Sequence, residues 1–265
     1  MGATLIDLTQ PLDQNAPVYP GDPPFSSQQS CTVDKDGYSI HALSCSSHIG
    51  THIDAPSHFI ADGATIDQLP PSAFILPALV LDVSHKKERE CIFWDAVEPV
   101  ADRIRPGTAV LFHTGWSQYW GNGASGRCFD HPWLATDVAE RLVALGVRVI
   151  GVDTMSPDQC PVPAGNGGGG GGGDGSAPDL GVHRAILGAG GFIVENLTNL
   201  DALLAAQNKE PGSQVIVSVL PLRIVGCDGS PVRAVAWLQS QSQGGSLFVT
   251  CGSLLLLPDF VWCFY

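Results

Sequence analysis

The segment His48-Ile-Gly-Thr-His52-Ile-Asp54-Ala-Pro-Ser-His58-Phe59 holds three of the eight histidines of this 265-residue chain, together with an aspartate. In an extended strand, alternate side chains point to the same face. Because His48, His52 and Asp54 all occupy even positions, a strand would project them together and turn the intervening residues toward the core. The segment therefore predicts a strand that presents two imidazoles and a carboxylate on one side.

Two residues of this segment favour a strand over a helix. Gly50 is unfavourable inside a helix, and Pro56 removes a backbone donor that a helix interior needs. On a helix the two histidines at i and i+4 would also meet, but Asp54 would point elsewhere. We expect the chain to turn at Pro56 and to bring His58 back beside the other polar groups.

The spacing of these groups suits a metal site. Two imidazoles and a carboxylate are ligands that Zn²⁺ or Mn²⁺ accepts. The alternative is a set of hydrogen-bonded structural residues, but burying four ionisable groups without a cation would leave unpaired polar atoms. Asp54 has two oxygens and could bridge two metals. His183 and Glu195 are candidates for further ligands, although spacing alone does not assign them.

Composition narrows the choice of partners. The chain carries 13 basic and 26 acidic residues, a net charge of -13, which disfavours nucleic acid and anionic membrane surfaces. The apolar run before Pro258 spans about a dozen residues, short of the ~20 that a transmembrane helix needs. The first residues lack the pattern of a signal peptide, and the eight cysteines form no C-x-x-C pair, so we expect free thiols and a cytoplasmic protein.

Hydrophobic patterning predicts an α/β protein built around a mixed sheet or barrel. A helix is expected over 136–146, capped by Thr136 or Asp137 and ended by Gly146, and a short helix is expected from 183. The glycine-rich run 165–175 is predicted to be a flexible insertion, and 239–265 a tail outside a single domain over 1–238. Strands are expected over 5–9, 78–83, 109–116, 147–153, 191–197, 214–226 and 231–238.

The chain resembles the cyclase family of metal-dependent hydrolases, whose best-known activity is that of kynurenine formamidase (arylformamidase). The pattern His48-x-Gly-Thr-His52-x-Asp54-Ala-Pro-x-His58-Phe carries this resemblance. Further matches extend it over about residues 4–238: Pro20-Gly21-Asp22, Asp62-Gly63-Ala64, Thr114-Gly115-Trp116, Gly151-Val-Asp153-Thr-x-Ser156-Pro-Asp158, His183, Glu195-Asn196-Leu197, Pro221-Leu222 and Asp228-Gly229-x-Pro231-Val-Arg233.

The resemblance implies a swivelling β/β/α fold in a homodimer or larger homo-oligomer, with one or two divalent ions per subunit. By position, His48, His52 and Asp54 would hold one metal, and Asp54, His183 and Glu195 a second. His58 would be the catalytic acid/base. Tyr19 stands where bacterial formamidases commonly have a tryptophan, and it would form an aromatic wall of the substrate site.

The activity implied by the resemblance is hydrolysis of N-formylkynurenine to kynurenine and formate, a step of tryptophan catabolism. A bound metal would activate water and polarise the amide carbonyl. One alternative is an isatin-type hydrolase that opens a cyclic amide. Another is a non-catalytic metal-binding protein on the same scaffold.

Overall fold

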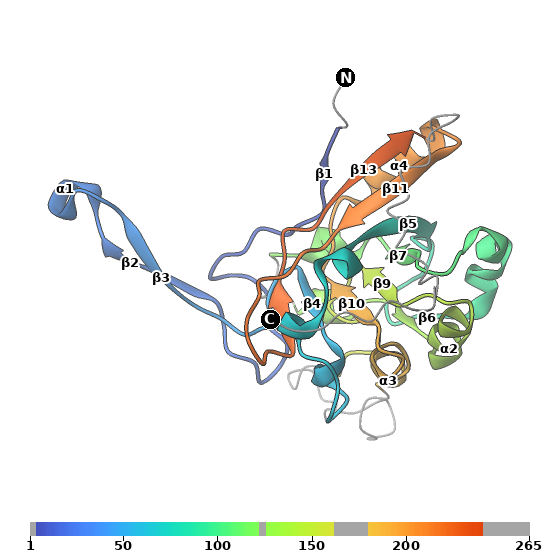
Figure 1. Cartoon of the computed structure of the whole chain (residues 1–265), viewed down its shortest axis with the longest axis horizontal. Helices are drawn as coiled ribbons and strands as arrows, with labels where there is room; N and C mark the ends of the chain where they lie inside the picture. The colour runs from blue at the N-terminus through green and yellow to red at the C-terminus, as the bar shows by residue number, and fades with distance from the viewer. Residues whose placement is uncertain (1–3, 122–125, 162–179, 241–265) are drawn as a thin grey trace, which may run out of the picture.

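A computed structural model describes residues 4–121, 126–161 and 180–240 of the chain (Figure 1). The helices are α1 (Val33–Asp36), α2 (Thr136–Ala144), α3 (Gly181–Gly188) and α4 (Leu200–Lys209). The main sheet contains β1 (Ile6–Asp7), β4 (His52–Asp54), β5 (Ile75–Asp82), β7 (Ala109–His113), β9 (Val149–Val152), β10 (Phe192–Glu195), β11 (Ser213–Ser218), β12 (Gly229–Pro231) and β13 (Val235–Ser240). Two smaller sheets pair β2 (Ser26–Cys31) with β3 (Ile40–Ser44) and β6 (Cys91–Ile92) with β8 (Trp133–Leu134). Short 3₁₀ turns lie at Pro56–His58, Ile66–Gln68, Pro71–Phe74, Trp94–Ala96, Glu98–Arg103, Trp116–Tyr119 and Arg127–Phe129.

The nine-stranded sheet is mixed and curled. Its strand order is β1-β13-β11-β5-β7-β9-β10-β4-β12. The four strands β5, β7, β9 and β10 run parallel, and the strands on either side pair antiparallel. Just beyond β1, Thr9 forms a bridge with Leu197, which follows β10. The sheet thus bends back on itself as a half-barrel. This agrees with the predicted mixed sheet or barrel.

Side chains along the central strands alternate between the two faces of the sheet, so their buried apolar residues form two clusters. In β5, Ala78 and Val80 belong to one cluster, whereas Leu79 and Leu81 belong to the other. Helix α4 packs on the first cluster, and α2 and α3 pack on the second. Both faces of these strands are therefore buried, which explains their nearly continuous apolar sequences.

Most of the predicted elements are present, with shifted ends. The expected helix over 136–146 is α2, and Gly146 follows it with a φ of +86°. The predicted cap is wrong, because Ala135 occupies the N-cap position and no side chain caps the helix. The strand predicted over 214–226 ends at Ser218, before Pro221, and α4 was not predicted.

The predicted strand that carries His48, His52 and Asp54 is also wrong in part. Only His52–Asp54 forms β4, because Gly50 adopts a φ of +65° and turns the chain before the strand begins. His48 lies in that turn. The proline turn was predicted correctly, since Pro56–His58 forms a 3₁₀ turn directly after the strand.

A hairpin made of β2 and β3, with α1 at its tip, stands away from the rest of the fold (Figure 1). Every residue of β3 is exposed. Four of the chain's exposed large apolar side chains lie on this hairpin: Val33, Tyr38, Ile40 and Leu43. A lone two-stranded hairpin is marginally stable in water, and this arm leaves its apolar side chains exposed.

Several sequence predictions concern parts of the chain outside the described residues. The glycine-rich run 165–175 is one of them, and all but the first two residues of the predicted tail 239–265 are another. Gln239 and Ser240 continue β13. No helix among the described residues is long and apolar enough to cross a membrane.

Gly63 is expected to be intolerant of any side chain. A Cβ at this position would lie 2.6–2.7 Å from backbone atoms of Pro56 and Ser57, in the turn that carries His58. We expect Gly63→Ala to lower the free energy of unfolding by about 1–3 kcal/mol, because backbone must shift to make room. Urea denaturation measures this change. The control Gly188→Ala places its Cβ at an ordinary 3.7 Å from Ile60, and an equal loss of stability in both variants would contradict the prediction.

Candidate metal centre

Strand pairing brings two of the candidate ligands together. β4 and β10 are antiparallel neighbours, and His52 lies opposite Glu195 in their register. Because side chains alternate along β4, Ile53 enters the apolar core while His52 and Asp54 project from the other face. The Nε2 atom of His52 lies 3.3 Å from Glu195 Oε2 and 3.4 Å from Asp54 Oδ1.

His183 reaches the same place from the first turn of α3. Its Nε2 atom lies 3.5 Å from Asp54 Oδ2 and 3.4 Å from Glu195 Oε1. Asp158 holds this histidine, since its carboxylate accepts the Nδ1–H of His183 at 2.6 Å and the backbone N–H groups of Val182 and His183 at 3.0 and 3.1 Å. Asp158 therefore satisfies free N–H groups at the start of the helix and orients the imidazole.

His48 joins the cluster although it lies outside the strand. Its Nδ1 atom is 2.7 Å from Asp54 Oδ1, and its Nε2 atom is 2.9 Å from Asp228 Oδ2. The ring lies against the backbone of Gly229, where a Cβ would come within 2.8 Å of His48 Cε1. Glycine is thus required at 229 if His48 is to keep this position.

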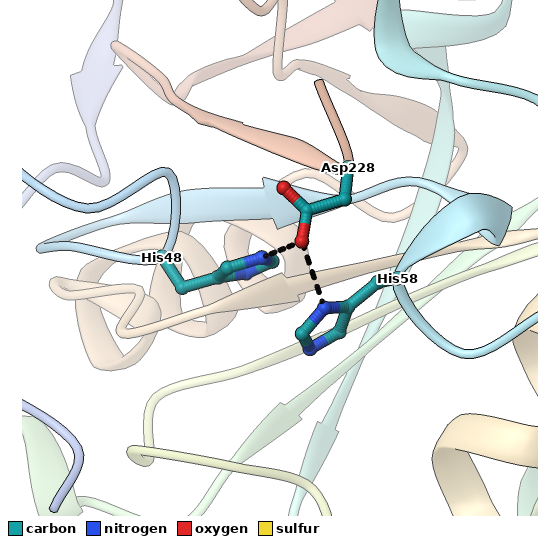
Figure 2. A group of neighbouring side chains, drawn as sticks. All are labelled: His48, His58 and Asp228. Carbon is teal, nitrogen blue, oxygen red and sulfur yellow. Dashed lines mark hydrogen bonds and ion pairs between the residues drawn. The ribbon is translucent and has the colours of Figure 1, made fainter. Parts of the chain in front are cut away.

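His58 stacks on His48 from the turn after β4. The two ring centroids are 3.9 Å apart, and the planes are inclined by 30°. The Nδ1 atom of His58 lies 3.1 Å from Asp228 Oδ2, the same oxygen that contacts His48 (Figure 2). Burial lowers the pKa of His58 below its usual 6.5, so this ring is neutral at pH 7 and can accept a proton.

The donor set fits a divalent cation. Carboxylate and carbonyl oxygens only accept hydrogen bonds, so Nδ1 of His183 and Nδ1 of His52, which is 2.9 Å from the Gly50 carbonyl, carry protons. Their Nε2 atoms then turn toward Asp54 and Glu195. His52 Nε2 and Asp54 Oδ2 are buried and have no hydrogen-bond partner, as expected of atoms that face a metal position.

Two groups of possible ligands share Asp54. One consists of His48, His52 and Asp54, and the other of Asp54, His183 and Glu195; within each, the ligand atoms lie within 4.8 Å of one another. These are the two sets that the sequence suggested. The structure brings all five residues together, and their role as metal ligands stays a prediction.

Protonated histidines balance the negative charge of the carboxylates in this cluster. Burial opposes a charge on His48 and on His52, but bonds to Asp228 and Asp54 raise the pKa of His48 to about 9, and the neighbouring carboxylates of Asp54 and Glu195 raise the pKa of His52 to about 10. Burial likewise opposes a charge on Asp54, yet its bonds to the surrounding histidines hold its pKa well below 3.8. A divalent cation would replace these protons, so metal binding should release them.

A cavity of about 510 Å³ opens over the cluster. Its apolar walls include Tyr19, the predicted substrate-binding residue, and Phe59, whose ring stacks on His183 at 4.6 Å. Burial raises the pKa of Tyr19 to about 12, so its phenol is neutral. The cavity lining therefore combines polar groups with aromatic rings.

Sequence reasoning gave no role to two carboxylates that hold the site, Asp158 and Asp228. Both lie in segments that were matched to the family, but no local pattern connects either one to a distant histidine. Asp153, in the same matched segment as Asp158, accepts hydrogen bonds from Thr114 and Gly115 and so holds a turn. The four remaining histidines (His41, His85, His113 and His131) do not line the cavity.

The fold and the cluster define an α/β protein with a curled mixed sheet and a candidate metal centre at its edge. Residues 6–159 match the Cyclase family model. Kynurenine formamidase of Sphingopyxis alaskensis is 32% identical over 236 residues, 86% of this chain and 95% of that protein. The Bacillus cereus kynurenine formamidase is 32% identical over 237 residues, 87% and 95% of the two chains. Isatin hydrolase A from Ralstonia solanacearum has a TM-score of 0.73 at 26% identity, covering 89% of this chain and 92% of its own. The chain belongs to the cyclase family.

Divalent cations are expected to stabilise the folded protein. Binding to the native state alone adds about 2.7 kcal/mol when the free cation is at a hundred times its Kd. Chelator-treated protein should therefore gain thermal stability with added Zn²⁺ or Mn²⁺, and Asp54→Asn should lose most of that gain. Differential scanning calorimetry measures both. The control Asp130→Asn removes a carboxylate that pairs with Arg89, and an undiminished gain in the Asp54 variant would contradict the assignment.

Proposed function

We propose that the protein is a metal-dependent hydrolase of amide bonds, and that its substrate is an aryl formamide, foremost N-formylkynurenine. The observation that carries this proposal is the shared carboxylate of Asp54. It joins two groups of possible metal ligands beside a neutral imidazole, in a cavity whose lining also includes aromatic rings. The names of the formamidase relatives support the reaction class.

In this proposal, His48, His52 and Asp54 hold one cation, and Asp54, His183 and Glu195 hold a second. When bound, a divalent cation polarises a carbonyl group and makes water acidic enough to ionise near neutral pH. The donor set of imidazoles and carboxylates suits Zn²⁺ or Mn²⁺. The protein contributes the fixed orientation of its ligands, through Gly50 for His52 and Asp158 for His183.

His58 moves the proton in the proposed reaction. Asp228 accepts its Nδ1–H, which leaves the lone pair on Nε2 to take a proton from the attacking water. Water adds to the formyl carbon, the C–N bond breaks, and the same proton passes to the departing aryl amine. Imidazole suits both transfers because its pKa lies near neutrality.

The cavity walls favour an aromatic substrate. Tyr19 and Phe59 offer flat apolar surfaces on which an aryl ring can pack. The half-buried neutral phenol of Tyr19 can also donate a hydrogen bond to a substrate carbonyl. Opening of a cyclic aryl amide is the second candidate reaction, and the likeness to isatin hydrolase A is the observation that favours it. A non-catalytic metal-binding protein is the third reading, and the neutral His58 beside the ligands speaks against it.

The activity is tested with a substrate panel on metal-reconstituted protein. We expect N-formylkynurenine to be hydrolysed with a higher kcat/KM than isatin, and we expect His58→Ala to lower kcat by about 10²–10⁴-fold, the usual contribution of general acid–base catalysis. Absorbance of the released amine follows the reaction. The control His131→Asn alters a buried histidine that contacts Cys160 instead of the cavity. Turnover of isatin alone would favour the second candidate, and turnover of neither would favour the third.

We further propose that the protein forms a homodimer or a larger homo-oligomer through its hairpin arm. The arm exposes Val33, Tyr38, Ile40 and Leu43, of which Leu43 is 67% accessible. Apolar groups gathered in this way mark protein interaction surfaces. A second copy of the chain would bury them and stabilise a hairpin that has little support from its own subunit.

Leu43→Asp should weaken this assembly. A charge at a buried apolar contact has a high desolvation cost, so the variant should shift toward the monomer. Size-exclusion chromatography with light scattering at matched concentrations measures the change. The control Phe93→Asp alters another exposed apolar residue away from the arm. A wild-type protein that is monomeric at tens of micromolar would rule out the proposal.

The cytoplasm is the compartment that we propose for the protein. The six described cysteines are free: Cys31, Cys45, Cys91, Cys128, Cys160 and Cys227. Free thiols are usual where glutathione keeps proteins reduced.

A further inference from the structure

Asp228 lies in the loop that leads into β12, far along the chain from the histidine segment. β12 pairs antiparallel with β4, and Gly229 is opposite Asp54. The backbone carbonyl of Asp228 accepts the N–H of Ala55 at 2.8 Å. Backbone pairing thus places Asp228 beside the end of β4 independently of its side chain.

One oxygen of the Asp228 carboxylate serves two histidines. Oδ2 is 2.9 Å from His48 Nε2 and 3.1 Å from His58 Nδ1 (Figure 2). The other oxygen, Oδ1, accepts a hydrogen bond from Ser47 at 2.9 Å. A carboxylate oxygen has two lone-pair sites, so a single Asp228 can receive both imidazole N–H groups.

We propose that Asp228 is a positioning residue that sets the ring orientation and the protonated nitrogen of both His48 and His58. With Nε2–H of His48 on Asp228, its Nδ1 faces Asp54 and is the atom available to a cation. With Nδ1–H of His58 on the same oxygen, its Nε2 is free for proton transfer. Asp228 would in this way couple the metal centre to the proton-transfer residue. The part that concerns His58 rests on the proposed function, whereas the part that concerns His48 does not.

Two other roles are open to this carboxylate. It could merely support the loop, but the backbone pairing of β12 with β4 already does so without the side chain. It could itself be a metal ligand, because His48, His58 and Asp228 also place their ligand atoms within 4.8 Å of one another. The positioning role is favoured because Ser47 and both histidines supply three donors to Asp228, and the two histidines take both lone-pair sites of Oδ2.

The test compares Asp228→Asn and Asp228→Ala with the wild type. We expect each to weaken Zn²⁺ binding by about ten- to a hundredfold in competition with a chromophoric chelator, the usual effect of losing a carboxylate behind a ligating histidine. The number of ions bound should not change. Long-range ¹H–¹⁵N NMR should show His58 protonated at Nδ1 in the wild type and in mixed tautomers in the variants. At saturating metal, kcat should fall while KM changes less than about twofold.

Asp67→Asn is the matched control. Asp67 is a partly exposed carboxylate that accepts the N–H of Gly226 at 2.9 Å, so it holds the same loop without touching a histidine. This control should keep the wild-type metal affinity and tautomers. If it weakened metal binding as much as the Asp228 variants, or if the Asp228 variants alone failed to fold, the side chain would be a loop support and the proposal would be overturned.

Two further outcomes separate this proposal from the proposed function. Wild-type Zn²⁺ affinity and an unchanged His58 tautomer in Asp228→Asn would overturn the positioning role, and so would loss of one bound ion per chain. If the wild-type protein bound metal but hydrolysed no substrate, the proposed function would fail. The affinity and NMR measurements would still decide the role of Asp228.

Discussion

The buried carboxylate of Asp54 is the group on which the rest of the site depends. It is 1% exposed, and Glu195, also buried, lies within the same cluster. Removing a charged carboxylate from water costs several kcal/mol unless opposite charge and hydrogen bonds compensate. Three imidazoles surround these two acids, and the raised pKa of each histidine expresses that compensation. The cluster is therefore stable only while protons or a cation balance the carboxylates.

The sheet determines which residues reach this carboxylate. Asp54 and Glu195 come from neighbouring strands, His183 comes from the helix before β10, and Asp228 comes from the strand edge on the other side of β4. The apolar faces of the same strands and of α3 pack in the two core clusters. Hydrophobic burial thus supplies the stability that offsets the cost of collecting ionisable groups at one end of the sheet.

Local sequence pattern predicted the parts of the fold that local physics determines. Strands β5, β7, β9 and β10 follow from apolar runs of the right length, and α2 follows from its periodicity and from Gly146. The histidine segment was predicted to cluster, but the reason given for His48 was wrong. A turn at Gly50 with positive φ, not strand alternation, brings that ring to Asp54. A glycine can equally be read as an interruption or as a turn until its φ is known.

Contacts between distant segments are what the sequence did not predict. Asp158 and Asp228 act on His183 and His48 through pairings whose sequence separations are 25 and 180 residues. Only the strand register and the position of α3 create these pairs, so composition and spacing contain no signal for them.

The polar cluster and the apolar walls of the cavity come from different parts of the fold. Four of the five candidate ligands come from β4, β10 and α3, whereas the cavity walls include Tyr19, Phe59 and Met155 from connecting segments. Because those segments lie outside the paired strands, they can change without disturbing the pairing that places the polar cluster. The aromatic and apolar part of the cavity lining can therefore vary while the polar cluster keeps its arrangement.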